Sequence, residues 1–148
     1  MEFTFDEKKT IEIDSKRYVC DPIDVNLIEG MSEHFPRIVE IGEEFKKLQK
    51  QMISKAGNAK KVKEISEKFF AKNRELLLEC QGFIHGTLGV EEYNEIFAGR
   101  KPNSTEHLKL CIYIFNEVMK DRAALLQEYV DLPAPQLQTA ASISDTNA

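Results

Sequence analysis

The feature that most constrains this chain is a long series of apolar residues spaced three and four positions apart. Such spacing puts side chains on one face of an α-helix, which has about 3.6 residues per turn. The first apolar stripe consists of Ile23, Leu27, Met31, Phe35, Ile38, Gly42, Phe45, Leu48 and Met52. The second stripe consists of Val62, Ile65, Phe69, Leu76, Cys80 and Phe83. Because only the short segment SKAGNAK separates them, the two stripes predict an antiparallel helical hairpin.

The ends of these two helices are predicted from capping residues. Asp21, which precedes a proline, is expected to be the N-cap of the first helix. Pro36 interrupts the first stripe, and an interior proline costs ~3 kcal/mol, so we expect a break or kink near residues 32–35. Gly57 is expected to adopt the left-handed cap conformation, and Asn58 is expected to start the second helix.

The first twenty residues follow a period of two instead. The apolar pairs spaced by two are Phe3 and Phe5, Ile11 and Ile13, and Tyr18 and Cys20. One apolar face with polar residues opposite predicts two or three short antiparallel strands, the last two joined by a tight turn at residues 14–16. Since so small a ribbon is marginal alone, we expect it to pack on helices.

Two further helices are predicted after the hairpin. Gly86 and Gly89 bracket a short break, and Gly99 ends a short helix that begins near Val90. Asn103, with a glutamate three residues later, resembles a capping box at the start of a last long helix. The apolar stripe of that helix consists of Leu108, Cys111, Ile112, Phe115, Val118, Met119, Leu125 or Leu126, and Tyr129.

These elements predict an α+β fold that is mainly α, with a short N-terminal antiparallel β-ribbon packed on a bundle of four to five helices. We expect one globular domain over residues 1–130, with the ribbon in 1–20 and the helices in 21–130. Residues 131–148 contain two prolines and mostly small or polar side chains, so we expect a disordered C-terminal tail.

Composition narrows the class of protein. The three cysteines are an odd number without CxxC spacing, which disfavours a disulfide framework or a zinc site and favours reduced core thiols. No stretch approaches the roughly 18 apolar residues of a membrane span. The acidic start MEFTFDE lacks the basic-then-apolar order of a signal peptide. We therefore expect a cytoplasmic protein with no membrane partner.

The segment FIHGTLGVEEYNEIF contains the residues that most resemble a catalytic loop. His85 lies beside glycines, but the sequence has no second histidine at metal spacing and no phosphate-binding pattern such as GxxxxGK[ST]. The acids Glu91, Glu92 and Glu95 fit the first turn of a helix. We interpret His85 as structural or capping and expect no catalytic residue, no metal, no cofactor and no enzyme.

Positive charge is concentrated in one region. The net charge of the chain is −5, yet residues 46–74 hold ten basic residues against two acids, a local charge of +8. This basic patch consists of Lys46, Lys47, Lys50, Lys55, Lys60, Lys61, Lys63, Lys68, Lys72 and Arg74. We expect no aromatic residue on its polar side, and no recognition-helix pattern accompanies it. A solvated face is the favoured interpretation, an acidic protein partner comes next, and nucleic acid is disfavoured.

The helix junction also carries a family resemblance. The pattern FI-x-x-x-LG-x-x-x-Y-x-x-IF-x-x-R is supplied by Phe83, Leu88, Gly89, Tyr93, Ile96, Phe97, Gly99 and Arg100, and a final helix follows it. Together with the opening RYVCDPIDVNLIE and the long hairpin, residues 10–130 resemble the tail assembly chaperones of long-tailed, siphovirus-like phages and prophages of low-GC Gram-positive bacteria.

The resemblance implies a non-enzymatic helical protein that binds the apolar tape measure protein and keeps it soluble while tail tube protein polymerises around it. In such families a frameshift often produces a longer form that recruits tube protein, and a flexible tail after Val130 would suit a tether. Such a chaperone needs an apolar groove between helices. Candidate partner-binding residues, which we also interpret as core in most cases, are Leu77, Ile84, Tyr93, Phe97, Tyr113, Ile114 and Leu125.

A second functional class stays open at this point. The chain could be a small phage-encoded regulator or inhibitor that binds nucleic acid or an acidic host protein through the basic hairpin tip. Self-association into a homo-oligomer and the identity of the client are not decided by the sequence.

Overall fold

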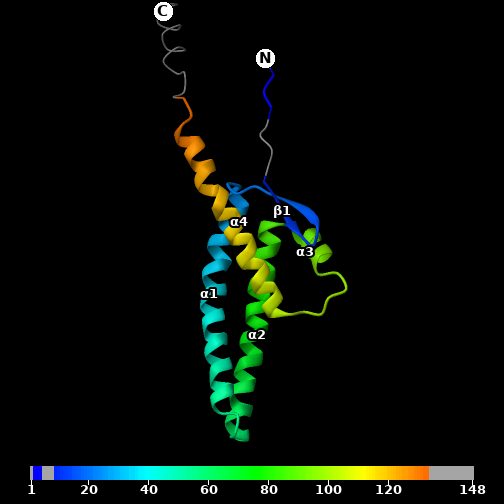
Figure 1. Cartoon of the computed structure of the whole chain (residues 1–148), viewed down its shortest axis with the longest axis vertical. Helices are drawn as coiled ribbons and strands as arrows, with labels where there is room; N and C mark the ends of the chain where they lie inside the picture. Colours follow the sequence, from blue (N-terminus) through cyan, green and yellow to red (C-terminus); the bar gives the residue numbers. More distant parts are fainter. Residues whose placement is uncertain (1, 5–8, 134–148) are drawn as a thin grey trace, which may run out of the picture.

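The computed structural model describes residues 2–4 and 9–133, so most of the predicted C-terminal tail lies outside it. The elements are β1 (Lys9–Ile13), β2 (Lys16–Cys20), α1 (Val25–Ser54), α2 (Ala59–Thr87), α3 (Val90–Ile96) and α4 (Ser104–Val130). In Figure 1, α1 and α2 form a long hairpin, and α4 lies along its upper part and extends beyond it. The predicted mainly α fold with an N-terminal antiparallel ribbon is confirmed, with four helices.

The β-ribbon is a single antiparallel pair. Its register places Ile11 opposite Tyr18, and both side chains are buried as the alternation predicts. Asp14 and Ser15 have φ values of 50° and 64°, and two successive positive values are typical of a type I′ hairpin turn. Residues 2–4 form no strand, and the four residues that follow them lie outside the described part of the chain.

Contacts with α4 hold the ribbon on the helices. The ammonium of Lys9 donates to the backbone oxygen of Glu117 at 2.7 Å and to the carboxylate of Asp121 at 2.6 Å. Burial of Lys9 opposes its charge, but the hydrogen bond and the negative charge of Asp121 outweigh it, so the pKa of Lys9 is raised. The hydroxyl of Tyr113 donates to the carbonyl of Glu12 at 3.1 Å. The ribbon therefore packs on a helix, as predicted.

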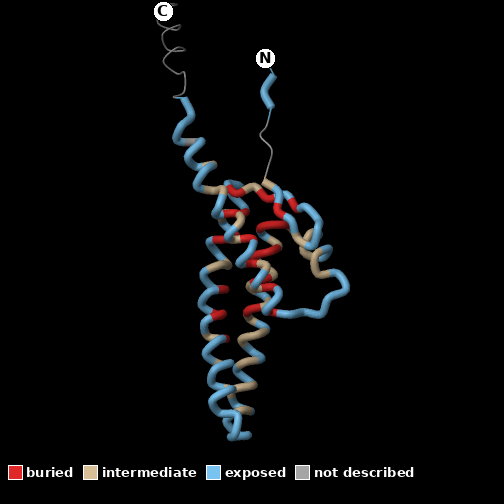
Figure 2. The backbone as a smooth tube through the Cα atoms, viewed as in Figure 1, coloured by how far each residue is buried: buried red, intermediate tan, exposed pale blue. Residues whose placement is uncertain are grey.

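The hydrophobic core lies in the half of the hairpin nearest the ribbon (Figure 2). Phe35 of α1 stacks on Phe115 of α4 with ring centroids 3.9 Å apart. The thiol of Cys111 donates to the carbonyl of Cys80 at 3.6 Å and so links α4 to α2. All three cysteines are free and buried, as predicted. Burial raises the pKa of Cys20 to about 11 and also raises that of Cys111, which keeps both thiols protonated at neutral pH.

The first helix begins later than predicted, because Asp24 and not Asp21 is its N-cap. The Asp24 carboxylate accepts from the backbone N–H of Asn26 at 3.0 Å. Asp21 instead holds the turn before the helix. Pro22 is buried, and its carbonyl accepts from Arg122 of α4 at 3.3 Å. The Pro22 carbonyl thus binds α4, and the first helical turn begins after Asp24.

Helix α1 continues through Pro36 without the predicted break. The residues on either side bind α2: His34 lies 3.0 Å from Glu79, and Arg37 lies 2.9 Å from the other oxygen of the same carboxylate. Gly82 makes room for the His34 ring, since a Cβ there would lie 2.8 Å from Cε1. Packing against α2 thus offsets the hydrogen bond that proline cannot make.

Two of the predicted cap positions are confirmed and two of the glycine roles are corrected. Asn58 caps α2 and Asn103 caps α4, each accepting backbone N–H groups of the first turn. Gly57 does not have the predicted positive φ. Gly86 lies inside α2, so the break falls only at Gly89, where φ is +116°. The hydrogen bonds of α2 therefore persist one turn further than the glycine spacing indicated.

Helix α4 is turned relative to its predicted stripe. Ile112 and Met119 are 43% and 39% exposed, while Ile114 is fully buried beside Cys111 and Val118. The ribbon and α2 contact α4 from different sides, so the buried face is wider and shifted from the one that spacing alone predicted.

Replacing Pro36 by alanine should stabilise the protein by about 1–3 kcal/mol, because alanine restores an N–H that can bond to the carbonyl of Ser32. Urea unfolding followed by circular dichroism would measure the change. Glu33→Ala, on the same exposed turn, should change the free energy of unfolding by less than about 0.5 kcal/mol. A lower stability of Pro36→Ala would show that α1 depends on the proline.

Candidate partner-binding surface on the helical hairpin

Tyr93 is the centre of a polar junction between α2, α3 and α4. Its hydroxyl oxygen accepts from the side-chain amide of Gln81 at 2.8 Å and lies 2.8 Å from Nε2 of His107. Nδ1 of His107 lies 2.7 Å from the backbone carbonyl of Asn103. A carbonyl can only accept, so Nδ1 carries the proton and Nε2 accepts from the Tyr93 hydroxyl. A neutral imidazole therefore satisfies the network, with one ring nitrogen donating and the other accepting.

His107 lies fully buried in this junction. Its ring stacks on Phe97 with centroids 3.9 Å apart, and His85 meets Tyr93 edge-on at 4.7 Å. Burial lowers the pKa of His107, although its hydrogen bond to the carbonyl of Asn103 opposes the shift. The contact of His85 with Tyr93 agrees with the structural interpretation of this residue, which stays a prediction. Sequence reasoning missed His107, whose one local signal is its position four residues after the helix cap.

The seven predicted partner-binding residues do not form one surface. Ile84 and Ile114 are fully buried, so as candidates for contact with a partner they are corrected to core. Tyr93 and Phe97 are half-buried within the junction. Among the other three, Leu77 and Leu125 are half-buried and Tyr113 is 39% exposed.

A different part of the hairpin is open to a partner. Helix α4 begins at Ser104, whose hydroxyl bonds to the side chain of Asn73 on α2. Residues 45–72, here called the distal arm, extend past this point as two helices (Figure 1). Phe45 stacks on Phe69 at 4.5 Å where the arm begins. The apolar residues between the arm's helices, here called the seam, are half-buried: Leu48, Met52, Val62, Ile65 and Phe69.

The seam is half-buried because two helices cannot enclose it. In the half nearest the ribbon, α4 is a third helix against the hairpin, and the core there is closed. Figure 2 shows buried positions in that half and intermediate or exposed positions toward the tip. The distal arm therefore has the cross-section of a helical bundle that lacks one member.

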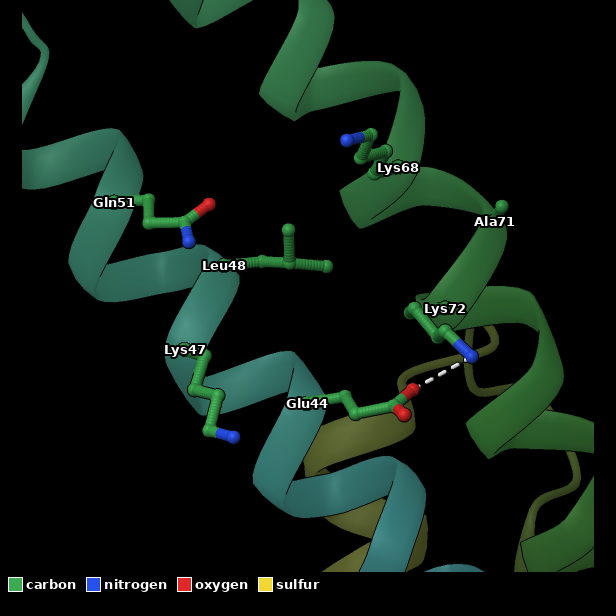
Figure 3. Close-up of a pocket in the computed structure, with 7 residues that line it drawn as sticks. All are labelled: Glu44, Lys47, Leu48, Gln51, Lys68, Ala71 and Lys72. Carbon is green, nitrogen blue, oxygen red and sulfur yellow. Dashed lines mark ion pairs between the residues drawn. The ribbon is translucent and has the colours of Figure 1, made fainter.

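On one face of the distal arm, α1 and α2 leave an apolar groove with a volume of about 350 Å³ (Figure 3). The groove is lined by Glu44, Lys47, Leu48, Gln51, Lys68, Ala71 and Lys72. In Figure 3, Leu48 extends from α1 into the space between the helices, and Ala71 lies at the edge of α2 farther from α1. Leu48 and the aliphatic stems of the lysines make the floor, and Ala71 lines its outer edge.

Ion pairs close the groove at the end nearer the core. Lys72 lies 2.6 Å from Glu44 on the opposite helix and 3.2 Å from Glu75 on its own. Hydrogen bonds to these two carboxylates raise the pKa of Lys72. Glu75 also contacts Arg37 at 3.4 Å, and Arg37 reaches Glu79 at 2.9 Å. This network joins α1 to α2 repeatedly and fixes how the two helices are aligned.

Among the described residues, most side chains of the predicted basic patch are not paired with a carboxylate. Lys72 is paired, and Lys46 lies 3.5 Å from Glu43. Within the described residues, no ion pair involves the other eight members, all of them exposed: Lys47, Lys50, Lys55, Lys60, Lys61, Lys63, Lys68 and Arg74. Phe70 is 66% exposed in the same region, so the expectation of no aromatic residue on the polar side was wrong. The arm thus combines open apolar surface with uncompensated positive charge.

Within residues 2–4 and 9–133, no group of three or more His, Cys, Asp and Glu side chains is arranged to hold a metal ion. No helix of the described part has the length and apolar character needed to cross a membrane. Comparison with protein-family models, curated proteins and solved structures finds no match. The function is therefore inferred from the residues of the hairpin and from the family resemblance carried by residues 83–100.

Replacing Tyr93 by phenylalanine should cost about 1–3 kcal/mol of stability, because the buried Nε2 of His107 loses its donor. Chemical unfolding would measure the loss. Tyr113→Phe is the matched control: it also removes one hydroxyl, but from an exposed hydrogen bond to Glu12, and should cost less than about 1 kcal/mol. Equal losses in the two variants would contradict the role of the junction.

The lowered pKa of His107 predicts a pH dependence of stability. Below about pH 6.5 the His107 side chain binds a proton in the unfolded chain but not in the folded chain. The contribution of His107 to the free energy of unfolding is therefore fully present above that pH. It declines as the pH falls toward the folded pKa, by up to about 1.4 kcal/mol per pH unit. Unfolding experiments between about pH 7.5 and 5.5 should show a shallower decline for His107→Gln than for His34→Gln or the unaltered chain. An unchanged slope in His107→Gln would disprove the assignment.

Proposed function

We propose that this chain is a non-enzymatic chaperone that binds an extended helical client through its distal arm. The observation that supports this most directly is the half-buried seam of the arm. A client helix laid in the groove would cover the seam from the face of the hairpin opposite α4, which is the helix-in-groove mode of recognition. Completing the burial of two half-buried aliphatic side chains contributes roughly 2 kcal/mol to the free energy of client binding. Each contact is therefore weak and reversible.

Weak contacts suit a protein that has to release its client. Several copies bound along one extended chain keep it soluble, because each covers a separate apolar segment. An incoming partner can then displace them one at a time. The proposed client is the tape measure protein of a long-tailed phage, the incoming partner is tail tube protein, and the proposed setting is the cytoplasm of the bacterial host.

The identity of the client comes from the family resemblance. The residues that carry it, between Phe83 and Arg100, make the junction that connects α2, α3 and α4. Arg100 itself binds Asp14 of the ribbon turn at 3.0 Å. The pattern therefore supports a shared fold, and the distal arm supplies the proposed contact with the client.

Positive charge supports a second candidate function. The eight unpaired cations and the exposed Phe70 would also suit a regulator that binds nucleic acid or an acidic host protein. A phosphate backbone, however, gains nothing from the apolar floor at Leu48. We favour the chaperone because it uses both the charge and the apolar floor.

Co-expression with a fragment of a tape measure protein tests the proposal. The unaltered chain should raise the soluble fraction of the fragment severalfold, and Leu48→Gln should lose most of that effect because a polar side chain then lies in the seam. Leu78→Gln makes the same change on α2 at a residue that is 60% exposed, outside the arm, and should keep full activity.

Equal precipitation of the fragment with and without the chain would reject the chaperone function. For the second candidate, salt-sensitive binding of DNA or RNA that is lost on changing Lys60, Lys61 and Lys63 to glutamate would favour a regulator. No mobility shift at low salt would remove the nucleic-acid version.

A further inference from the structure

We propose that the groove of the distal arm is selective for acidic amphipathic helices, in which a narrow apolar stripe is flanked by glutamate or aspartate. This inference rests on the proposed function and names the chemistry of the client segment. It is carried by the joint presence of an apolar floor and unpaired cations on both rims of one groove.

The two rims come from different helices. Lys47 lies on the α1 side and Lys68 on the α2 side, and neither takes part in an ion pair among the described residues. Leu48 lies between them, so an apolar side chain of a bound helix can reach the floor. Carboxylates on either side of that stripe then lie within reach of one ammonium each, which favours charge-assisted hydrogen bonds.

The charges along the groove favour an acidic client segment. At the inner end Glu44 is neutralised by Lys72, so no uncompensated carboxylate of the groove repels an acidic helix. Toward the tip the exposed charged residues are Lys50 and Lys55 on α1 and Lys60, Lys61, Lys63, Glu64 and Glu67 on α2. The eleven-residue rise from Glu44 to Lys55 is about 17 Å, the length of three helical turns. A client helix of that length lies beside an arm whose residues 45–72 hold nine basic side chains against two acids, so its carboxylates meet a net positive field.

Other occupants make different demands on the same groove. A nucleic acid needs the lysines but not the floor, and its affinity would rise with any added positive charge. A second copy of this chain could offer the end of α4, where Leu126 is 52% exposed and Glu128 and Asp131 are exposed acids. The experiment below distinguishes a nucleic acid and a second copy of the chain from an acidic client helix.

The probe is a fluorescein-labelled synthetic peptide of about 18 residues, five helical turns, with a leucine stripe flanked by glutamates. Its controls are a scrambled peptide of the same composition and a version with lysine for glutamate. Fluorescence anisotropy with the full-length chain should show binding of the acidic amphipathic peptide, at least about tenfold weaker binding of the scrambled one, and none of the lysine version.

Three variants locate the binding. Ala71→Arg places a large cationic side chain at the exposed outer edge of the groove. It should obstruct a bound helix and weaken peptide binding about tenfold, whereas it would strengthen a purely electrostatic contact. Lys47→Glu/Lys68→Glu should abolish binding. Lys60→Glu/Lys61→Glu makes the same charge change at the tip and should leave at least half of the affinity. Circular dichroism confirms that each variant is folded.

Several results would overturn the inference. In the anisotropy experiment these are equal affinity for the scrambled peptide, tighter peptide binding by Ala71→Arg, or an equal loss of affinity in the two charge-reversal variants. In light scattering, the contradicting result is an oligomer of the chain alone that Lys47→Glu/Lys68→Glu disperses. If the tape measure fragment is solubilised equally by Ala71→Arg and the unaltered chain, the groove inference fails and the chaperone function stands. If the peptide binds as expected but no fragment is solubilised, the chaperone function fails and the groove's selectivity stands.

Discussion

Contact between α1 and α2 along their facing apolar stripes underlies every other feature of this molecule. The two helices have 30 and 29 residues, so their contact is much longer than the part that the rest of the chain can cover. Near the ribbon, α4 closes the contact and side chains such as Ile38 and Phe83 are fully buried. Toward the tip the same contact continues uncovered, and Leu48 stays half-buried. The hydrophobic core thus lies in one half of the hairpin, and the apolar seam of the other half stays partly open.

The junction around Tyr93 determines where one half ends and the other begins. Its hydrogen bonds tie Gln81 of α2 to His107 of α4 and so set the point at which the last helix meets the hairpin. From there α4 runs back toward the ribbon and ends beyond it. Because α4 is directed away from the tip, its length adds nothing to the cover of the distal arm. The buried neutral imidazole has a structural purpose here, since both of its nitrogens are used in holding three helices together.

Local features of the fold could be predicted because short-range physics decides them. The pairing of Ile11 with Tyr18 follows from alternation, and Asn58 and Asn103 cap helices because their side chains accept the free N–H groups next to them. The predictions at Pro36 and Asp21 failed where a contact with another helix outweighed the local preference. In the candidate site, the basic patch was recognised from sequence, but the groove was not.

By itself the sequence determined the helical and strand periodicities, the positions of most caps and the clustering of positive charge, since each depends on residues near one another in the chain. The tertiary structure alone decided which part of the apolar stripe is covered. Ile38 and Leu48 lie on one stripe, and the spacing that puts them there does not indicate which of them is covered. One is buried and the other half-open because burial depends on a third helix, and the course of the chain through the junction brings that helix to only one of them.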